Sequence, residues 1–134
     1  MKRLIIAATL IAGALFVWSS PVSADSQTFK MMAENGSGES GTVTLTPILG
    51  GTRVYVKIDG EPDGAIQPDH IHVGGCPGVG AVKYPLKDVV FGHSTTYIPK
   101  VTPDMIVGAS GGFAVNVHAG KDDMKTYVSC ANIK

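Results

Sequence analysis

The sequence predicts an all-β fold, a Greek-key β-barrel or sandwich of about seven or eight short strands. Apolar and polar residues alternate over short runs, and glycine and proline separate these runs roughly every 8–12 residues. No long stretch has the periodicity of an amphipathic helix. The 134 residues correspond to about one domain, and the chain contains no internal repeat or linker.

Residues 1–24 predict a secretory signal peptide. Lys2 and Arg3 precede an apolar run that ends at Trp18, and a small-residue cleavage site, VSA, follows at 22–24. The apolar run is about 15 residues long, which is short for a membrane span, and no second run follows. We therefore expect residues 25–134 to form the mature domain, exported to the periplasm or the extracellular space without a membrane attachment.

The charge of the mature chain argues against binding to nucleic acid. Loss of Lys2 and Arg3 leaves nine Lys and Arg against eleven Asp and Glu, a net charge of about −2. Nucleic-acid recognition needs a concentrated basic surface, and the sequence contains no cluster of Lys and Arg.

Alternation defines the strands in the first half of the mature chain. In RVYVKI, residues 53–58, Val54, Val56 and Ile58 share one face, and TVTLT at 42–46 has the same pattern. The strands expected here are 27–34, 42–46, 53–58 and 70–73, and turns or loops are expected at 35–41, 47–51 and 59–68.

The second half begins with a Gly- and Pro-rich stretch at 74–88, which we expect to be irregular. A helical turn is expected within 101–108, with Asp104 early in it. Residues 119–125, AGKDDMK, are expected to form a polar loop. The remaining strands are predicted at 89–91, 94–99, 112–118 and 126–133.

The mature chain has two cysteines, Cys76 and Cys130. Because an exported protein matures in an oxidising compartment, a disulfide is the expected state, and two free buried thiols are the alternative. The bond would close a loop of about 54 residues, a constraint on the order of 4 kcal/mol in the chain-entropy model.

Strand alternation places three of the four histidines on faces that point away from the core. In HIHV, residues 70–73, Ile71 and Val73 are expected to face the core, so His70 and His72 face outward. In GFAVNVH, residues 112–118, the same alternation turns His118 outward.

Residues i and i+2 on one strand lie about 7 Å apart, near enough for both imidazoles to reach one ion. A third imidazole from a neighbouring strand would complete a three-nitrogen site, and imidazole suits copper and zinc. Ordinary solvent-facing histidines are the alternative. His93 follows Gly92 in an expected turn and is a weak candidate for a fourth ligand.

The chain resembles the copper/zinc superoxide dismutase family over most of residues 28–133. HIHVGGC is similar to the family's His-x-His copper motif followed by the disulfide cysteine. AVNVHAGKDD is similar to its late histidine strand, and YVSCANI to its terminal strand with the second cysteine. The compact form looks like loop-trimmed exported relatives and chordin-type domains.

This resemblance implies a Greek-key barrel, a bond between Cys76 and Cys130, and copper on His70, His72 and His118. The chain also departs from the enzymes. It has no histidine between Cys76 and Phe91, so neither a bridging histidine nor a zinc site can be assigned. Tyr127 stands where the enzymes place the arginine that guides the anion, and the late electrostatic loop is trimmed to AGKDDMKT.

The expected function is an exported copper-binding domain with weak or no dismutase activity. The first alternative is an active copper-only dismutase that converts superoxide to oxygen and hydrogen peroxide. Fast turnover would need positive potential to steer the anion, and the lysines that could supply some of it are Lys83, Lys87, Lys121 and Lys125. The second alternative is a structural or interaction module without chemistry.

Other interpretations of the same residues are weaker. A blue-copper site would need a cysteine thiolate beside two histidines, and Cys76 is better used in the disulfide. A cysteine nucleophile with His72 as its base would need that thiol free. Asp122 and Asp123 are either solvated charges or groups that orient a copper histidine.

Overall fold

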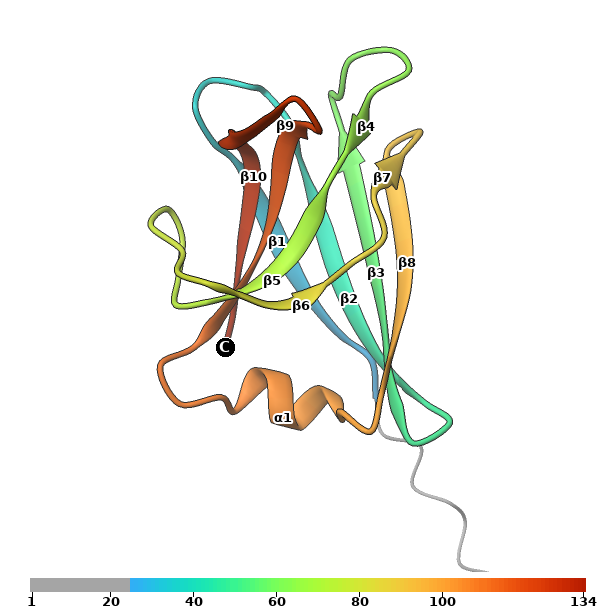
Figure 1. The fold of residues 1–134 in the computed structure, drawn as a ribbon. Coiled ribbons are helices and arrows are strands. Elements are labelled where there is room, and N and C mark those ends of the chain that lie inside the picture. Colours follow the sequence, from blue (N-terminus) through green and yellow to red (C-terminus); the bar gives the residue numbers. More distant parts are fainter. Residues whose placement is uncertain (1–24) are drawn as a thin grey trace, which may run out of the picture.

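The strands form one antiparallel sheet that curls strongly into a half-barrel (Figure 1). The computed structural model describes residues 25–134; residues 1–24, where the signal peptide is predicted, lie outside the described range. In chain order the elements are β1 (Gln27–Ala33), β2 (Ser40–Ile48), β3 (Gly51–Asp59), β4 (Ile66–Gln67), β5 (Asp69–Val73), β6 (Val82–Pro85), β7 (Val89–Val90), β8 (His93–Pro99), α1 (Pro103–Val107), β9 (Phe113–Gly120) and β10 (Asp123–Ile133).

The order across the sheet is β4-β7-β8-β3-β2-β1-β10-β9-β5-β6. Strand β1 joins the two halves, because Gln27–Met31 pair with β2 whereas Met32 and Ala33 pair with β10. The curl carries β5 and β6 across in front of β2 and β3 (Figure 1). Strands from distant parts of the sequence thereby enclose one core.

The inward-facing positions of the predicted strands form this core. The buried apolar residues that alternation had placed inward are Val43, Leu45, Val54, Val56, Ile58, Ile71, Phe113, Val115 and Val117. The prediction for Val73 is wrong, since 41% of its surface is exposed. Val73 is the last residue of β5, where the chain leaves the sheet and no strand packs over it.

The all-β prediction is confirmed, but the sheet has ten strands rather than seven or eight. The additional strands include β4 and β6, which fall in segments expected to be loop or irregular. Both are short edge strands, and each is held by pairing with one neighbour rather than by an alternating sequence of its own. Residues 119–125 are also not a loop, because β9 and β10 continue to Gly120 and from Asp123 around a tight turn.

The short helix α1 lies across the lower end of the half-barrel (Figure 1). Its start follows the usual rules: Thr102 caps it by accepting a hydrogen bond from the Met105 amide, and Pro103 occupies the first turn. Ile106 is fully buried against the core. Within residues 25–134, no helix has the length and apolar character needed to cross a bilayer.

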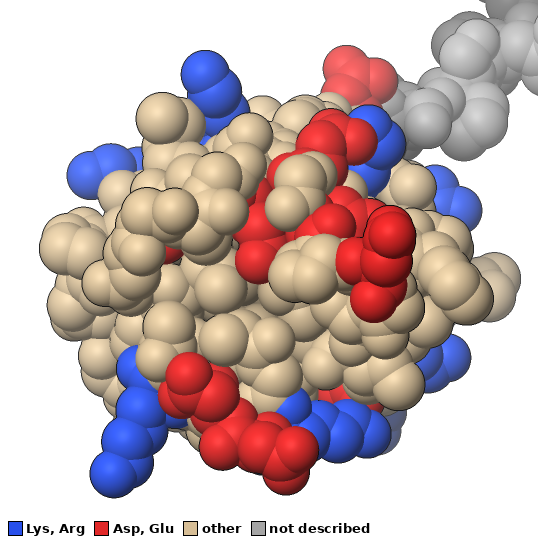
Figure 2. All heavy atoms as spheres, turned by 90° about the horizontal axis from the view of Figure 1, so that it is seen from above, with Lys and Arg blue, Asp and Glu red and all other residues tan. Residues whose placement is uncertain are grey.

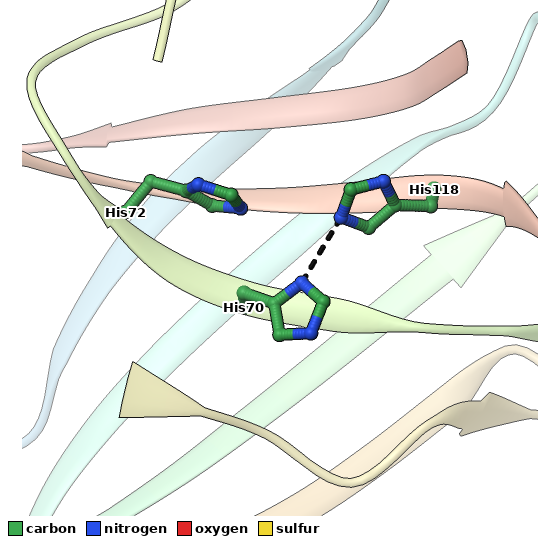
Figure 3. A group of neighbouring side chains, drawn as sticks. All are labelled: His70, His72 and His118. Atoms are coloured by element: carbon green, nitrogen blue, oxygen red, sulfur yellow. Dashed lines mark hydrogen bonds between the residues drawn. The ribbon is translucent and has the colours of Figure 1, made fainter. Parts of the chain in front are cut away.

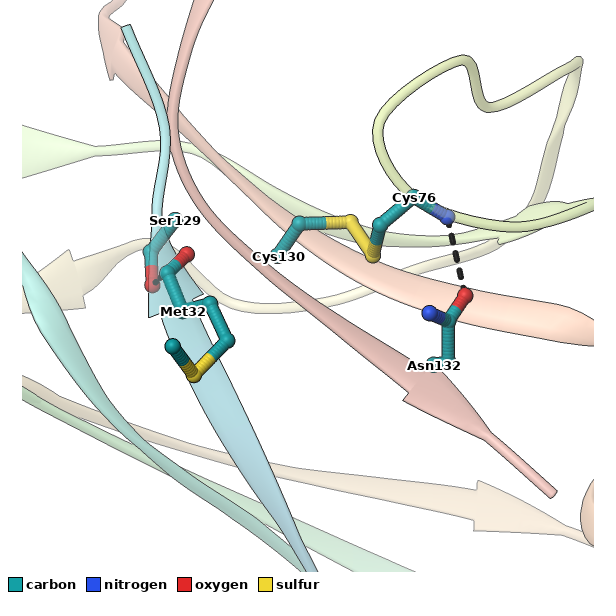
Figure 4. Close-up of a disulfide and its surroundings, with 5 residues drawn as sticks. All are labelled: Met32, Cys76, Ser129, Cys130 and Asn132. Carbon is teal, nitrogen blue, oxygen red and sulfur yellow. Dashed lines mark hydrogen bonds between the residues drawn. A yellow bond between two sulfur atoms is a disulfide. The ribbon is translucent and has the colours of Figure 1, made fainter. Parts of the chain in front are cut away.

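Cys76 and Cys130 form a disulfide, as predicted (Figure 4). The bond connects the loop after β5 to the C-terminal half of β10 across a sequence separation of 54 residues. The Cys76 amide also donates a hydrogen bond of 2.9 Å to Oδ1 of Asn132, two residues beyond Cys130. The loop between β5 and β6 is therefore fastened to the terminal strand.

Candidate metal centre

Three histidines meet on the outer face of the sheet, where β5 pairs with β9 (Figure 3). His70 lies opposite Asn116 and His72 lies opposite Ala114 in this pairing. His118 follows Asn116 by two residues and so projects from the same face of β9. The predicted trio is thus brought together by two adjacent antiparallel strands.

The distances between the three rings suit a shared ion. Each histidine offers one ring nitrogen, and these nitrogens all lie within 4.8 Å of one another. His70 Nδ1 is 3.0 Å from His118 Nε2. The ring centroids are 5.5 Å apart for His70 and His72, and 6.0 Å apart for His72 and His118.

Backbone carbonyls define which nitrogen two of the rings present. Nδ1 of His72 donates to the carbonyl oxygen of Gly80 at 2.9 Å, and Nδ1 of His118 donates to that of Met124 at 2.8 Å. A carbonyl oxygen can only accept, so in the neutral rings the proton lies on Nδ1. Both Nε2 atoms then carry a lone pair: that of His72 has no partner within residues 25–134, and that of His118 accepts from His70 Nδ1. A ring whose Nδ1 is held by a backbone carbonyl and whose Nε2 carries the lone pair has the arrangement of a metal-binding histidine.

One ligand atom is buried without a partner. His72 Nε2 is inaccessible and makes no hydrogen bond to any residue of the described range 25–134. Buried polar atoms in folded proteins are nearly always paired. A metal ion among the three rings would satisfy this lone pair, so the residues fit such an ion.

His72 and His118 are each only 3% exposed. The expectation that they are outward-facing is correct for strand direction, but these two rings do not lie in open solvent. Burial lowers the pKa of His118 and of His70, and the neighbouring imidazoles lower it further. Neutral imidazoles are the form that binds metal, and protons compete with a metal ion for the same nitrogens. The lowered pKa values therefore favour metal binding.

Tyr127 stands beside the three rings. It is the cross-strand partner of His118, and its ring centroid lies 5.0 Å from that of His118 and 6.2 Å from that of His72. Irregular pairing on both sides of Tyr127 breaks the simple alternation of β10. Its contact with the site could not be predicted from the alternation for that reason.

Asp69 lies on the inner side of β5, directly before His70, and is fully buried. Ser94 Oγ donates to its Oδ2 at 3.0 Å. Burial raises the pKa of the Asp69 carboxyl to about 7, although the hydrogen bond from Ser94 lowers it. Asp69 was not singled out from the sequence; the only signal for its burial is that it shares its strand face with Ile71.

The remaining candidates lie outside the trio. His93 is an exposed residue at the start of β8, where its Nδ1 donates to the carbonyl oxygen of Phe91, so it is not in the expected turn. Asp123 is exposed, and its carboxylate accepts from the Thr126 amide. A second cluster contains Glu34 with Cys76 and Cys130, but both sulfurs are already bonded to each other.

Figure 2 views the end of the half-barrel formed by the loops at 34–39, 59–65 and 121–122. Acidic side chains gather there in two groups, and lysine and arginine side chains stand mainly around the edge (Figure 2). The acidic residues of these loops and of the strand ends that adjoin them are Glu34, Glu39, Asp59, Glu61, Asp63, Asp122 and Asp123. Lys121 forms an ion pair of 2.9 Å with Asp88. The acidic charge at the end of the half-barrel nearest His118 therefore favours the approach of cations over that of anions.

A comparison of the chain with protein-family models, with curated proteins and with solved structures finds no match. The protein is an all-β domain with a disulfide and a three-histidine cluster that could hold a metal ion.

Proposed function

We propose that the protein is an exported, superoxide dismutase-like Greek-key domain that binds one copper ion through His70, His72 and His118 and has weak or no dismutase activity. The observation that carries this proposal is the convergence of His70 Nδ1, His72 Nε2 and His118 Nε2, two of them aimed by backbone carbonyls. The disulfide agrees with an oxidising compartment outside the cytoplasm.

The donor set supports copper. Three neutral imidazoles suit copper and zinc, and copper(II) binds more tightly than zinc to nitrogen sites. Copper(I) is satisfied by three ligands, so the trio can hold either oxidation state. The three histidines lie on two paired strands, which keeps their spacing stable when an ion is bound.

The surroundings argue against fast turnover of superoxide. Efficient attraction of an anion needs a positive potential around the site. Here the nearby loops are acidic, and the charge of Lys121 is offset by Asp88. The expected role is therefore to hold copper rather than to cycle it rapidly.

Copper analysis of the exported protein, together with a dismutase assay on the same sample, tests the proposal. We expect about one copper per chain, and no copper after the double substitution His72→Ala and His118→Ala. His93→Ala is the matched control, because it removes an exposed histidine outside the cluster.

Copper retained by the double variant would contradict the ligand assignment. Turnover near the diffusion limit, about 10⁸–10⁹ M⁻¹s⁻¹, would favour the active copper-only dismutase instead. A chain that binds no metal would favour the structural or interaction module.

A further inference from the structure

We propose that Tyr127 determines which external ligands can reach the metal site. Its ring closes the solvent side of the histidine trio and prevents external anions from reaching the bound metal. This inference rests on the proposed copper site. The three histidines bind the ion, and Tyr127 is not a ligand but controls access to it.

The position of Tyr127 supports this role. The residue comes from β10, whereas His72 comes from β5, and β9 lies between these two strands. The Tyr127 ring nevertheless approaches the rings of both His118 and His72, at centroid distances of 5.0 and 6.2 Å. The phenol ring therefore extends from β10 across β9 toward β5, on the outer face of the sheet that carries the trio.

The floor of the site is closed as well. Asn116 lies on the face of β9 that carries His118, between His70 of β5 and Cys130 of β10 in the strand register. It is fully buried, beside the carboxyl of Glu34. Its complete burial means that solvent does not reach the trio past this position of β9.

The charges around the opening would also repel an anion. An aromatic ring presents a negative face, so Tyr127 offers an approaching anion no attraction through its ring. Asp123 adds a negative charge close by, because it pairs with Gly120, two residues beyond His118 on β9. A cation can approach the trio past these two groups. An anion would have to give up its hydration shell next to the Tyr127 ring and the Asp123 carboxylate, which offer it no favourable interaction in return.

Azide is the probe that tests this gate, because it binds to exposed copper(II) and changes the visible spectrum. The copper-loaded wild type is titrated with azide beside Tyr127→Ala, Tyr127→Phe and Tyr97→Ala. We expect Tyr127→Ala to bind azide about tenfold or more tightly than the wild type. Tyr127→Phe keeps the ring and should match the wild type. So should Tyr97→Ala, which removes an exposed tyrosine of β8.

Equal azide affinity for the wild type and Tyr127→Ala, with about one copper bound in each, would overturn the gate and leave the copper site intact. Loss of copper from the wild type itself would overturn the proposed function instead.

The metal-free chain provides a readout that does not depend on copper. Diethyl pyrocarbonate modifies accessible imidazoles, and mass spectrometry of peptides shows the modification at His118. We expect slow modification in the wild type and in Tyr127→Phe, and several-fold faster modification in Tyr127→Ala. An unchanged rate in Tyr127→Ala would show that the ring does not shield the site.

Discussion

Nδ1 of His72 donates a hydrogen bond to the carbonyl oxygen of Gly80, 2.9 Å away. Gly80 lies in the loop between β5 and β6 that also contains Cys76, and its own amide donates to the carbonyl oxygen of Val73 at the end of β5. The orientation of one candidate ligand therefore depends on a loop that the disulfide fastens to β10.

Replacing both cysteines, as Cys76→Ser with Cys130→Ser, should destabilise the protein and weaken copper binding together. A 54-residue loop is released, a loss on the order of 4 kcal/mol in the chain-entropy model. The freed loop then holds the Gly80 carbonyl less firmly against His72. Thermal unfolding and copper titration measure the two effects. A reductant should lower the melting temperature of the wild type and leave that of the double variant unchanged; an equal response of both proteins would contradict this account.

Copper should stabilise the folded chain by mass action, because the three ligands come together only after folding. At a free concentration of one hundred times Kd the gain is about 2.7 kcal/mol. A chelator should therefore lower the melting temperature of the loaded protein to that of the metal-free protein. His93→Ala should keep the shift. A similar shift in His72→Ala would mean that copper stabilises the chain from another place.

Two residues of β5 should respond differently to truncation. Ile71 is fully buried in the core, whereas Val73 is 41% exposed. Ile71→Ala should lower the free energy of unfolding by about 2–5 kcal/mol, and Val73→Ala should change it by less than about 1 kcal/mol. Urea unfolding of the metal-free variants measures both. Equal losses would show that β5 does not pack as the structure describes.

The stability of the metal-free protein should depend on the ionisation of Glu39. This residue is only 4% exposed, and its Oε2 accepts a hydrogen bond of 2.7 Å from Gln67 Nε2. Burial raises the pKa of the Glu39 carboxyl above 4.5, and the charge of Glu61 raises it further. The folded state thus favours the protonated carboxyl, so its contribution to stability declines as the pH rises from 4.5 through the raised pKa.

Glu39→Gln keeps an oxygen for Gln67 and removes this titration. We expect the variant to gain stability relative to the wild type as the pH rises through that window, measured by urea unfolding at several pH values. Asp69 also has a raised pKa, but it is present in both proteins and leaves the difference between them unchanged. Parallel stability curves would show that Glu39 is ionised without cost in the fold.

Much of the candidate site follows from local sequence. Alternation within 70–73 and 112–118 correctly puts His70, His72 and His118 on the face opposite to Ile71 and Val115, because side-chain direction in a strand depends only on parity. The inward residues of β2 and β3 follow from the same alternation. The disulfide follows instead from the presence of two cysteines in a chain expected to be exported. The short strands β4 and β6 do not follow from local sequence, since neighbouring strands rather than their own residues maintain them.

By itself, the sequence determined the β texture, the direction of the three histidines and the pairing of the two cysteines, because each is set by alternation or by composition. Only the tertiary structure decided that β5 and β9 are neighbours, that Gly80 and Met124 orient two of the rings, and that the Tyr127 ring lies beside His72 and His118. These features depend on strand register and on the curl of the sheet. Both arise from contacts between residues far apart along the chain.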